Sequence, residues 1–137
     1  MKLYQCLILA GVFQLLTYCT QNEEKVVQLH KNLMMLHDEE MAQMDQIYRL
    51  KTLLQSVDTT KVNTQELLQL IRSLEKADES MMIWMRNYKE PVVSESHEKK
   101  EEYYLQEINK LQNTKSLMQS SMDSATKYLK NYGMEVK

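Results

Sequence analysis

The sequence predicts an all-α protein made of a few long helices, and three observations indicate this class. The 137 residues include only two glycines and one proline, too few for the turns of a β-rich or α/β fold. Apolar residues recur at spacings of three and four, the period of an amphipathic helix. Charged residues make up 26% and hydrophobic residues 43%, as in a folded domain. The expected architecture is an elongated antiparallel three-helix bundle with coiled-coil-like heptads in residues 19–137, preceded by a signal peptide in residues 1–18.

The first 18 residues, MKLYQCLILAGVFQLLTY, differ from the rest of the chain. Lys2 is followed by an uncharged, mostly apolar run, and the chain becomes polar from Thr20 onward (TQNEEK). A positive start, a short apolar core and a sharp polar boundary are typical of a secretory signal peptide. The run is short for a membrane span and its flank is acidic. The alternative is a buried core helix, which is hydrophobic on all sides.

The segment LTYC, Leu16–Cys19, resembles a bacterial lipobox, in which the cysteine is lipidated. A leucine at position −3 and a small polar residue at −2 fit the pattern, whereas Tyr18 departs from the usual glycine, alanine or serine at −1. If the resemblance holds, Cys19 becomes the acylated first residue, Cys6 is discarded, and no thiol is left for a disulfide. The alternative is that Cys19 remains a free thiol or forms an intermolecular bridge.

Residues 23–55 are the first predicted helix, because apolar residues follow steps of three and four along it. The series is Leu33, His37, Met41, Met44, Tyr48, Lys51 and Leu54, widened by Leu29, Leu36, Ile47 and Leu50. The acidic run Asp38–Glu40 is expected on the solvated face. The segment SVDTTKVNT (56–64) breaks the pattern, and Asn63 with Glu66 predicts the start of the next helix through a capping box.

Residues 64–88 and 96–131 are the second and third predicted helices. Their series are Leu67, Ile71, Leu74, Asp78, Met81, Met85 and Tyr88, and Tyr104, Ile108, Leu111, Lys115, Met118, Met122, Ala125, Leu129 and Tyr132. Pro91 interrupts the chain between them, Ser94 or Ser96 can cap the third helix, and Gly133 suits a left-handed helix end. Short connections make neighbouring helices antiparallel. The alternative to an up-down-up bundle is a two-helix hairpin with a swinging third helix.

The stretch HKNLMMLHDEEMAQM (30–44) contains two histidines and four methionines. A turn near residue 60 places His37 opposite Ile83, and a turn near residue 92 places Met81 and Met82 near Tyr104 and Tyr103. Methionines and aromatic residues then share one half of the bundle: Met34, Met41, Met81, Met85, Trp84, Tyr103 and Tyr104. His30 and His97 are expected at the same end, as solvated histidines near helix ends.

Two interpretations of this stretch compete. Methionine is flexible and fills irregular gaps beside aromatic rings, which favours packing. Thioether and imidazole groups also suit Cu(I), and His37, Met41 and Met44 share one helix face. Helical spacing alone produces that geometry in a methionine-rich core, so packing without a bound metal is the expectation.

Other functional classes find little support in the sequence. HDEEM (37–41) lacks the second histidine of a zinc-protease motif, two glycines cannot build a phosphate-binding loop, and no serine or cysteine nucleophile has a recognisable base. Removing Lys2 with residues 1–18 leaves 16 basic and 19 acidic residues, a net charge of −3. Nucleic-acid binding requires clustered lysine and arginine instead. We therefore expect no enzymatic activity, no cofactor and no nucleic-acid partner.

Two stretches, LHDEEMAQMDQIYRLK (36–51) and MMIWMRNYK (81–89), resemble small exported helical lipoproteins of Bacteroidota that are often named "viral A-type inclusion protein". The resemblance spans most of the mature chain and implies coiled-coil-like helices. It implies no viral role, and no functional residue can be carried over from the group. The expected function is that of a lipid-anchored envelope protein, either structural or binding another envelope protein through a helix face. The alternative is a periplasmic helical bundle that binds a soft metal or a haem-type ligand.

Overall fold

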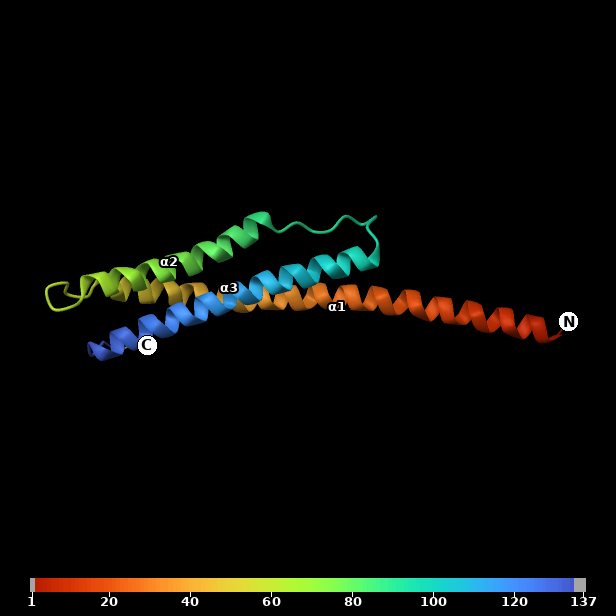
Figure 1. Ribbon diagram of the computed structural model, residues 1–137, viewed down its shortest axis with the longest axis horizontal. Coiled ribbons are helices and arrows are strands. Elements are labelled where there is room, and N and C mark those ends of the chain that lie inside the picture. The colour runs from red at the N-terminus through yellow and green to blue at the C-terminus, as the bar shows by residue number, and fades with distance from the viewer. Residues whose placement is uncertain (1, 135–137) are drawn as a thin grey trace.

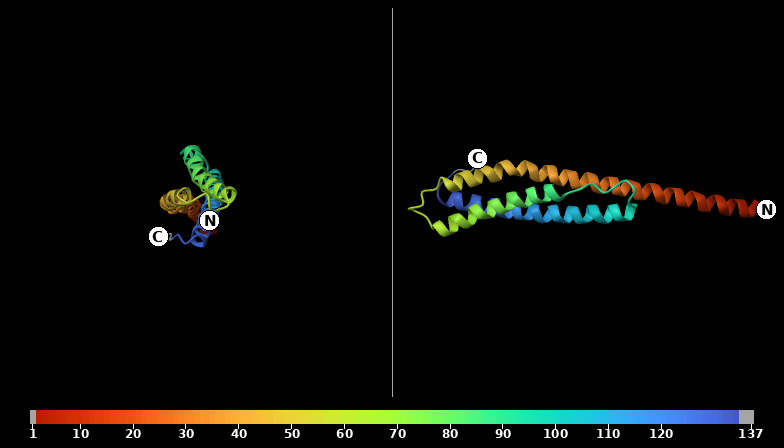
Figure 2. Two further views of the ribbon diagram at one scale, coloured as in Figure 1. Left: turned by 90° about the vertical axis from the view of Figure 1, so that its left-hand side faces the viewer. Right: turned by 90° about the horizontal axis from the view of Figure 1, so that it is seen from above.

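The computed structural model describes the backbone of residues 2–134 and the side chains of residues 22–134. This part of the chain forms three helices and no strand: α1 (Lys2–Gln55), α2 (Thr64–Asn87) and α3 (His97–Asn131). They pack along one another in an elongated bundle, in which α2 runs opposite to α1 and α3 (Figures 1 and 2). The predicted all-α class is confirmed. The helix expected at 23–55 lies within α1, which also continues through the segment expected to direct export.

Helices α1 and α3 run parallel with a nearly constant offset in residue number. Three pairs of contacting residues show this, because the members of each pair are separated by a similar number of residues in the sequence. Lys25 pairs with Glu101, the rings of His30 and Tyr104 lie 5.4 Å apart, and Lys115 Nζ donates to Glu39 Oε2 over 2.9 Å. Near its N-terminal end, α1 extends beyond the start of α3 without a helical neighbour (Figure 1). The bundle therefore has one end from which a single helix leaves.

The predicted helix ends are held by the residues expected to hold them. Asn63 Oδ1 accepts hydrogen bonds from the backbone N–H groups of the second and third residues after it, at 3.1 and 3.4 Å, and Ser96 Oγ accepts one from Lys99 N at 3.4 Å. Gly133 has a φ of 71°. Gly133 N donates to Lys130 O and the next amide donates to Leu129 O, the two bonds of a Schellman motif. These caps satisfy backbone groups that the helix itself leaves unpaired.

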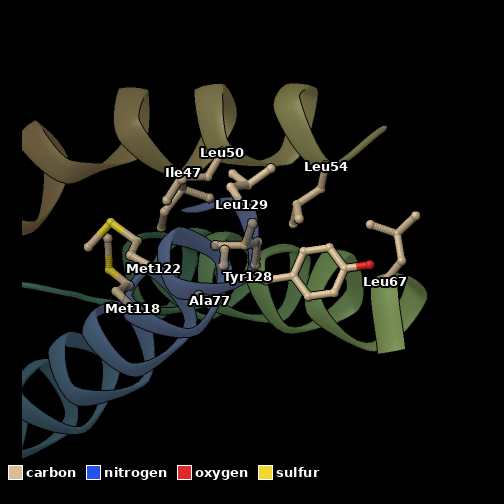
Figure 3. Close-up of a cluster of buried hydrophobic side chains, with 11 residues drawn as sticks. Ile47, Leu50, Leu54, Leu67, Ala77, Met118, Met122, Tyr128 and Leu129 are labelled. Atoms are coloured by element: carbon tan, nitrogen blue, oxygen red, sulfur yellow. The ribbon is translucent and has the colours of Figure 1, made fainter. Parts of the chain in front are cut away.

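The core consists of two clusters of buried side chains. The cluster nearer the α1–α2 connection, shown in Figure 3, contains Ile47, Leu50, Leu54, Leu67, Leu74, Ala77, Met118, Met122, Ala125, Tyr128 and Leu129. The cluster nearer the α2–α3 connection contains Leu33, Met81, Trp84, Tyr104 and Leu111. In α3 the two clusters are separated by the buried Thr114, and in α1 by the buried Glu40. Polar residues thus divide an otherwise apolar interior.

Several positions were assigned to the wrong side of a helix, among them Tyr132, which was expected to pack and is 45% exposed. Glu40, expected in solvent, is only 3% exposed, whereas Tyr48, expected to pack, is 65% exposed. Met85 is 41% exposed, and Ala77 and Trp84 are buried where Asp78 and Met85 were expected. The predicted α1 series contains two successive steps of four residues, which carry a position around the helix and away from its buried side. Alternating steps of three and four residues keep each position on that side. In α2, the buried face is rotated so that it includes Ala77 and Trp84. This rotation avoids burying the carboxylate of Asp78, which would cost free energy.

The pairing of α2 with α3 also differs from the expected one. Met81 was expected opposite Tyr104, but Trp84 donates to Glu107, which is three residues further along each helix. The reason is the connection 88–96, which is non-helical and extends alongside the first turns of α3 instead of making a tight turn (Figure 1). Met81 and Tyr104 still belong to one core cluster, so the methionines and aromatic residues gather at the expected end.

Replacing Leu111 by alanine should lower the free energy of unfolding by about 2–5 kcal/mol, because a fully buried leucine leaves a cavity. Leu111 is 0% exposed and Leu105 on the same helix is 48% exposed. Leu105→Ala is therefore the matched control, with an expected cost of at most about 0.5 kcal/mol. Urea unfolding followed by circular dichroism measures both, and equal losses would contradict this core.

Candidate functional site

The densest group of interacting polar and aromatic side chains lies where the α2–α3 connection meets the other helices. We call it the aromatic–carboxylate cluster: His30 from α1, Trp84 from α2, Tyr88 and Glu90 from the connection, and Tyr103, Tyr104 and Glu107 from α3. It draws on every element at this end of the bundle.

Glu90 is the hub of the aromatic–carboxylate cluster. Its Oε1 accepts a hydrogen bond from Tyr88 Oη at 2.8 Å, and its Oε2 accepts one from Tyr104 Oη at 2.9 Å. His30 Nε2 lies 2.9 Å from Glu90 Oε1. One carboxylate therefore joins α1, the connection and α3. Tyr103 adds a further tie, because its Oη accepts a hydrogen bond from Lys89 N at 3.2 Å.

The environment of Glu90 favours its ionised form. Partial burial acts to raise the pKa of this carboxyl, but the hydrogen bonds from Tyr88 and Tyr104 and the nearby His30 together outweigh burial and hold the pKa below its usual range. The tyrosines show the reciprocal effect: burial first, and then the bond to the Glu90 carboxylate, raises the pKa of both phenols. Both hydroxyls therefore stay protonated and act as donors at neutral pH.

The aromatic rings of the cluster form a continuous row. Trp84 stacks on Tyr88 at 5.0 Å with an interplanar angle of 26°, and Tyr88 lies 6.2 Å from Tyr103. Trp84 also buries its ring and donates its Nε1–H to Glu107 Oε2 at 2.9 Å. The other oxygen of Glu107 accepts from Lys110 Nζ at 2.6 Å. Glu107 is 4% exposed, so these two donors compensate a buried carboxylate.

This arrangement fits a structural clamp. The carboxylate oxygens of Glu90 and Glu107 accept hydrogen bonds from neighbouring side chains, and the aromatic rings stack on one another. Each stacked aromatic pair contributes about 0.5–1.5 kcal/mol to stability beyond the contribution of the area it buries. The cluster therefore fixes the path of residues 88–96 against α1 and α3.

A second polar group lies midway along α1 and α3. Lys115 Nζ lies 2.9 Å from Glu39 Oε2 and 3.5 Å from Glu40 Oε1. Burial raises the pKa of Glu40, opposed by the attraction of Lys115. The hydrogen bond to Glu39 in turn raises the pKa of Lys115. An open groove of ≈430 Å³ lies beside these three residues, with Gln119 and Met122 in its wall.

The residues considered for a soft-metal site lie on one continuous helix, as predicted. Met41 and Met44 are half-buried and pack against the apolar clusters. The ring of His37 lies 5.6 Å from that of Trp84, and its Nδ1 is 3.0 Å from Asp38 Oδ1. Within the residues whose side chains are described, no group of three or more His, Cys, Asp or Glu side chains is placed to hold a metal ion. The two methionines thus contact the core clusters, and the absence of a bound metal stays a prediction.

Sequence reasoning missed the polar contacts that organise this region. Glu90 was treated as part of a linker, His30 as solvated and Lys115 as an interruption of an apolar series. The structure instead ties His30 to Glu90 and Lys115 to Glu39 and Glu40. One signal was available, because a lone lysine in an apolar series implies an acidic partner on a facing helix. His97 is exposed, as expected.

The residues expected to direct export and carry the lipid are only partly described. The backbone of residues 2–21 belongs to α1, whereas the side chain of Cys19 lies outside the described residues. Over the part of the chain that the structure describes, no helix has a stretch long and apolar enough to cross a bilayer. The signal peptide and the lipidation of Cys19 therefore stay predictions.

Replacing Glu90 by glutamine should weaken the acid sensitivity of the fold. The pKa of Glu90 lies below its ordinary 4.5 in the folded state. Its contribution to stability is therefore present above about pH 4.5 and disappears as the pH falls through the lower folded pKa. Since the side chain is 55% exposed, solvent screening limits the effect to about 1 kcal/mol or less.

Urea midpoints measured between pH 3 and 7 test this prediction. Glu95→Gln is the control, because Glu95 is an exposed glutamate of the same connection. The decline of stability towards low pH should be shallower in Glu90→Gln than in Glu95→Gln. Identical pH profiles of wild type and Glu90→Gln would show that the carboxylate does not stabilise this end.

Replacing Met41 by leucine should cost less than about 1.5 kcal/mol, because the two side chains have similar volumes. The replacement removes the thioether, so it also tests the soft-metal alternative. Titration with Cu(I) under reducing conditions should give no tight stoichiometric binding in either protein. Tight binding by the wild type that is lost in Met41→Leu or His37→Ala would overturn the packing interpretation.

No protein-family model matches the chain, and neither the curated proteins nor the solved structures gave a match.

Proposed function

We propose that this protein is an exported lipoprotein whose three-helix bundle is a structural or protein-binding module at the surface of a cell-envelope membrane. The observation that carries the proposal is the continuity of α1. This single helix extends from the predicted export segment into the core of the bundle. An acyl group on Cys19 would thus be joined directly to a packed helix, without a flexible linker.

The spacing of buried residues supports coiled-coil-like packing in this module. Positions along each helix alternate steps of three and four, and most of them are buried or half-buried. They are Leu33, His37, Glu40, Met44, Ile47, Lys51 and Leu54 in α1; Leu67, Leu70, Leu74, Ala77, Met81, Trp84 and Tyr88 in α2; and Tyr104, Glu107, Leu111, Thr114, Met118, Ser121, Ala125 and Tyr128 in α3. This is the pattern of heptad packing, in which side chains of one helix fill spaces on the next. Such a bundle is a long, stiff body suited to hold a partner away from a membrane or to brace it.

An apolar stripe on α1 supports the protein-binding role. Val27, Met34, Met41 and Tyr48 recur every seven residues, so they lie on one side of the helix next to its buried positions. Val27 and Tyr48 are 62% and 65% exposed, and the two methionines are half-buried. Partner helices bind such stripes by apolar contact, and methionine adapts to the shape of a partner.

Cys19→Ala should abolish acylation, because the predicted modification requires the cysteine sulfur. The full chain, produced in a bacterium that acylates lipoproteins, should incorporate a labelled fatty acid and fractionate with membranes. Cys19→Ala should lose the label and be released or remain as an uncleaved precursor, while Cys6→Ala, the control, should keep the label. Absence of label in the wild type would refute lipid anchoring.

Tyr48→Glu should weaken binding to an envelope partner, because a charge placed in an apolar contact must be desolvated. Cross-linking and affinity capture from the envelope of the producing cell would identify proteins bound by the wild type. Gln112→Glu, an exposed change on α3, is the control and should capture the same proteins. A partner retained equally by both variants would place binding on another face.

A further inference from the structure

The α2–α3 connection presents two apolar side chains to solvent. Val93 is 93% exposed and Val92 is 60% exposed, and neither belongs to a core cluster. The turn that carries them has a defined shape: Glu95 N donates to Val92 O at 3.0 Å and Lys100 Nζ donates to Val93 O at 2.9 Å. These bonds hold two valines outward at a fixed place.

That place is the end of the bundle from which α1 leaves (Figure 1). Among the described side chains, Lys25, which contacts Glu101, and His30, which contacts Glu90, tie α1 to this end of the bundle. Cys19 precedes Lys25 by six residues, or about 9 Å along a helix at about 1.5 Å per residue. The predicted attachment point and the valine turn therefore lie at the same end.

We propose that Val92 and Val93 contact the interfacial layer of a zwitterionic phospholipid bilayer, so that the bundle stands on the membrane with its α2–α3 connection toward the lipid. The proposal rests on the lipid-anchored function proposed above. Two valines bind a membrane weakly by themselves, because affinity scales with buried apolar area. An anchor in the same chain makes their contact intramolecular, and a high effective concentration offsets weak affinity.

The charge of this end favours a zwitterionic surface over an anionic one. Residues 88–102 contain three lysines and five glutamates, a net charge of −2. Anionic lipid attracts basic segments instead. The aromatic–carboxylate cluster positions the turn, because Glu90 and Tyr88 immediately precede it and are tied to α1 and α3.

The test compares tryptophans introduced at the two ends of the bundle. Val93→Trp places a ring on the turn, and Thr59→Trp places one on the exposed α1–α2 connection at the opposite end (Figure 1). Trp84 is buried in the native protein and should contribute the same background to both variants. Each full-length protein is extracted from membranes of the acylating bacterium and reconstituted into phosphatidylcholine vesicles with or without brominated acyl chains, which quench tryptophan emission on contact.

Brominated lipid should reduce the emission of Val93→Trp and leave that of Thr59→Trp unchanged. Adding Val92→Asp to Val93→Trp should diminish the quenching, which checks that the native turn contributes beyond the introduced ring. Flotation with the vesicles separates the two proposals. Protein that does not float overturns both the anchor and this inference, whereas protein that floats with equal emission loss at positions 93 and 59 overturns only the orientation.

Discussion

The arrangement of the bundle depends on one electrostatic constraint, the pairing of a buried glutamate. Glu40 is 3% exposed, and its only cationic neighbour among the described residues is Lys115, at 3.5 Å. Lys115 is 42% exposed and the pair borders an open groove, so solvent screens it, and an unpaired Glu40 carboxylate costs less than the about 3–5 kcal/mol of a fully desolvated charge. A slip of α3 by one heptad would replace Lys115 with Ile108 or Met122 beside Glu40. The pair thus disfavours alternative registers that apolar packing alone tolerates, because one heptad of leucine and methionine resembles the next.

The register of α1 and α3, fixed at the middle of the bundle, determines which side chains of these helices contact each other near the α2–α3 connection. The separation that joins Lys115 to Glu39 also joins Lys25 to Glu101. It brings His30 beside Tyr104 as well, which leaves the Glu90 carboxylate within reach of both. The two carboxylates respond to their surroundings in opposite ways, because burial raises the pKa of Glu40 whereas donated hydrogen bonds hold that of Glu90 low. The carboxylate of Glu40 limits which registers of α1 and α3 are stable. The carboxylate of Glu90, as an anion, stabilises the register that is adopted.

Much of the fold follows from local features of the sequence. Asn63, Ser96 and Gly133 determine the helix ends through backbone chemistry, which is readable without tertiary context. The methionine-rich stretch follows the helical period, so its packing role could be predicted as well. The length of the α2–α3 connection could not, because Pro91 indicates a break but does not tell whether the chain turns at once or extends. That uncertainty displaced the expected partner of Met81 and hid the contacts of Glu90, since long-range polar pairs form only in the correct register.

The polar ties gather at the end where the bundle has fewest helices. Because α2 ends at Asn87, the first turns of α3 have α1 as their only helical neighbour, and two helices bury less apolar surface than three. The connection 88–96 supplies the missing third side, but it is short and mostly polar, so it cannot supply a leucine core. Hydrogen bonds to Glu90 and stacked tyrosines supply stabilising contacts instead. At the opposite end all three helices meet, and a cluster of leucines, methionines and Tyr128 suffices (Figure 3). Directional contacts therefore appear where apolar burial is limited, and they brace the bundle where α1 leaves it.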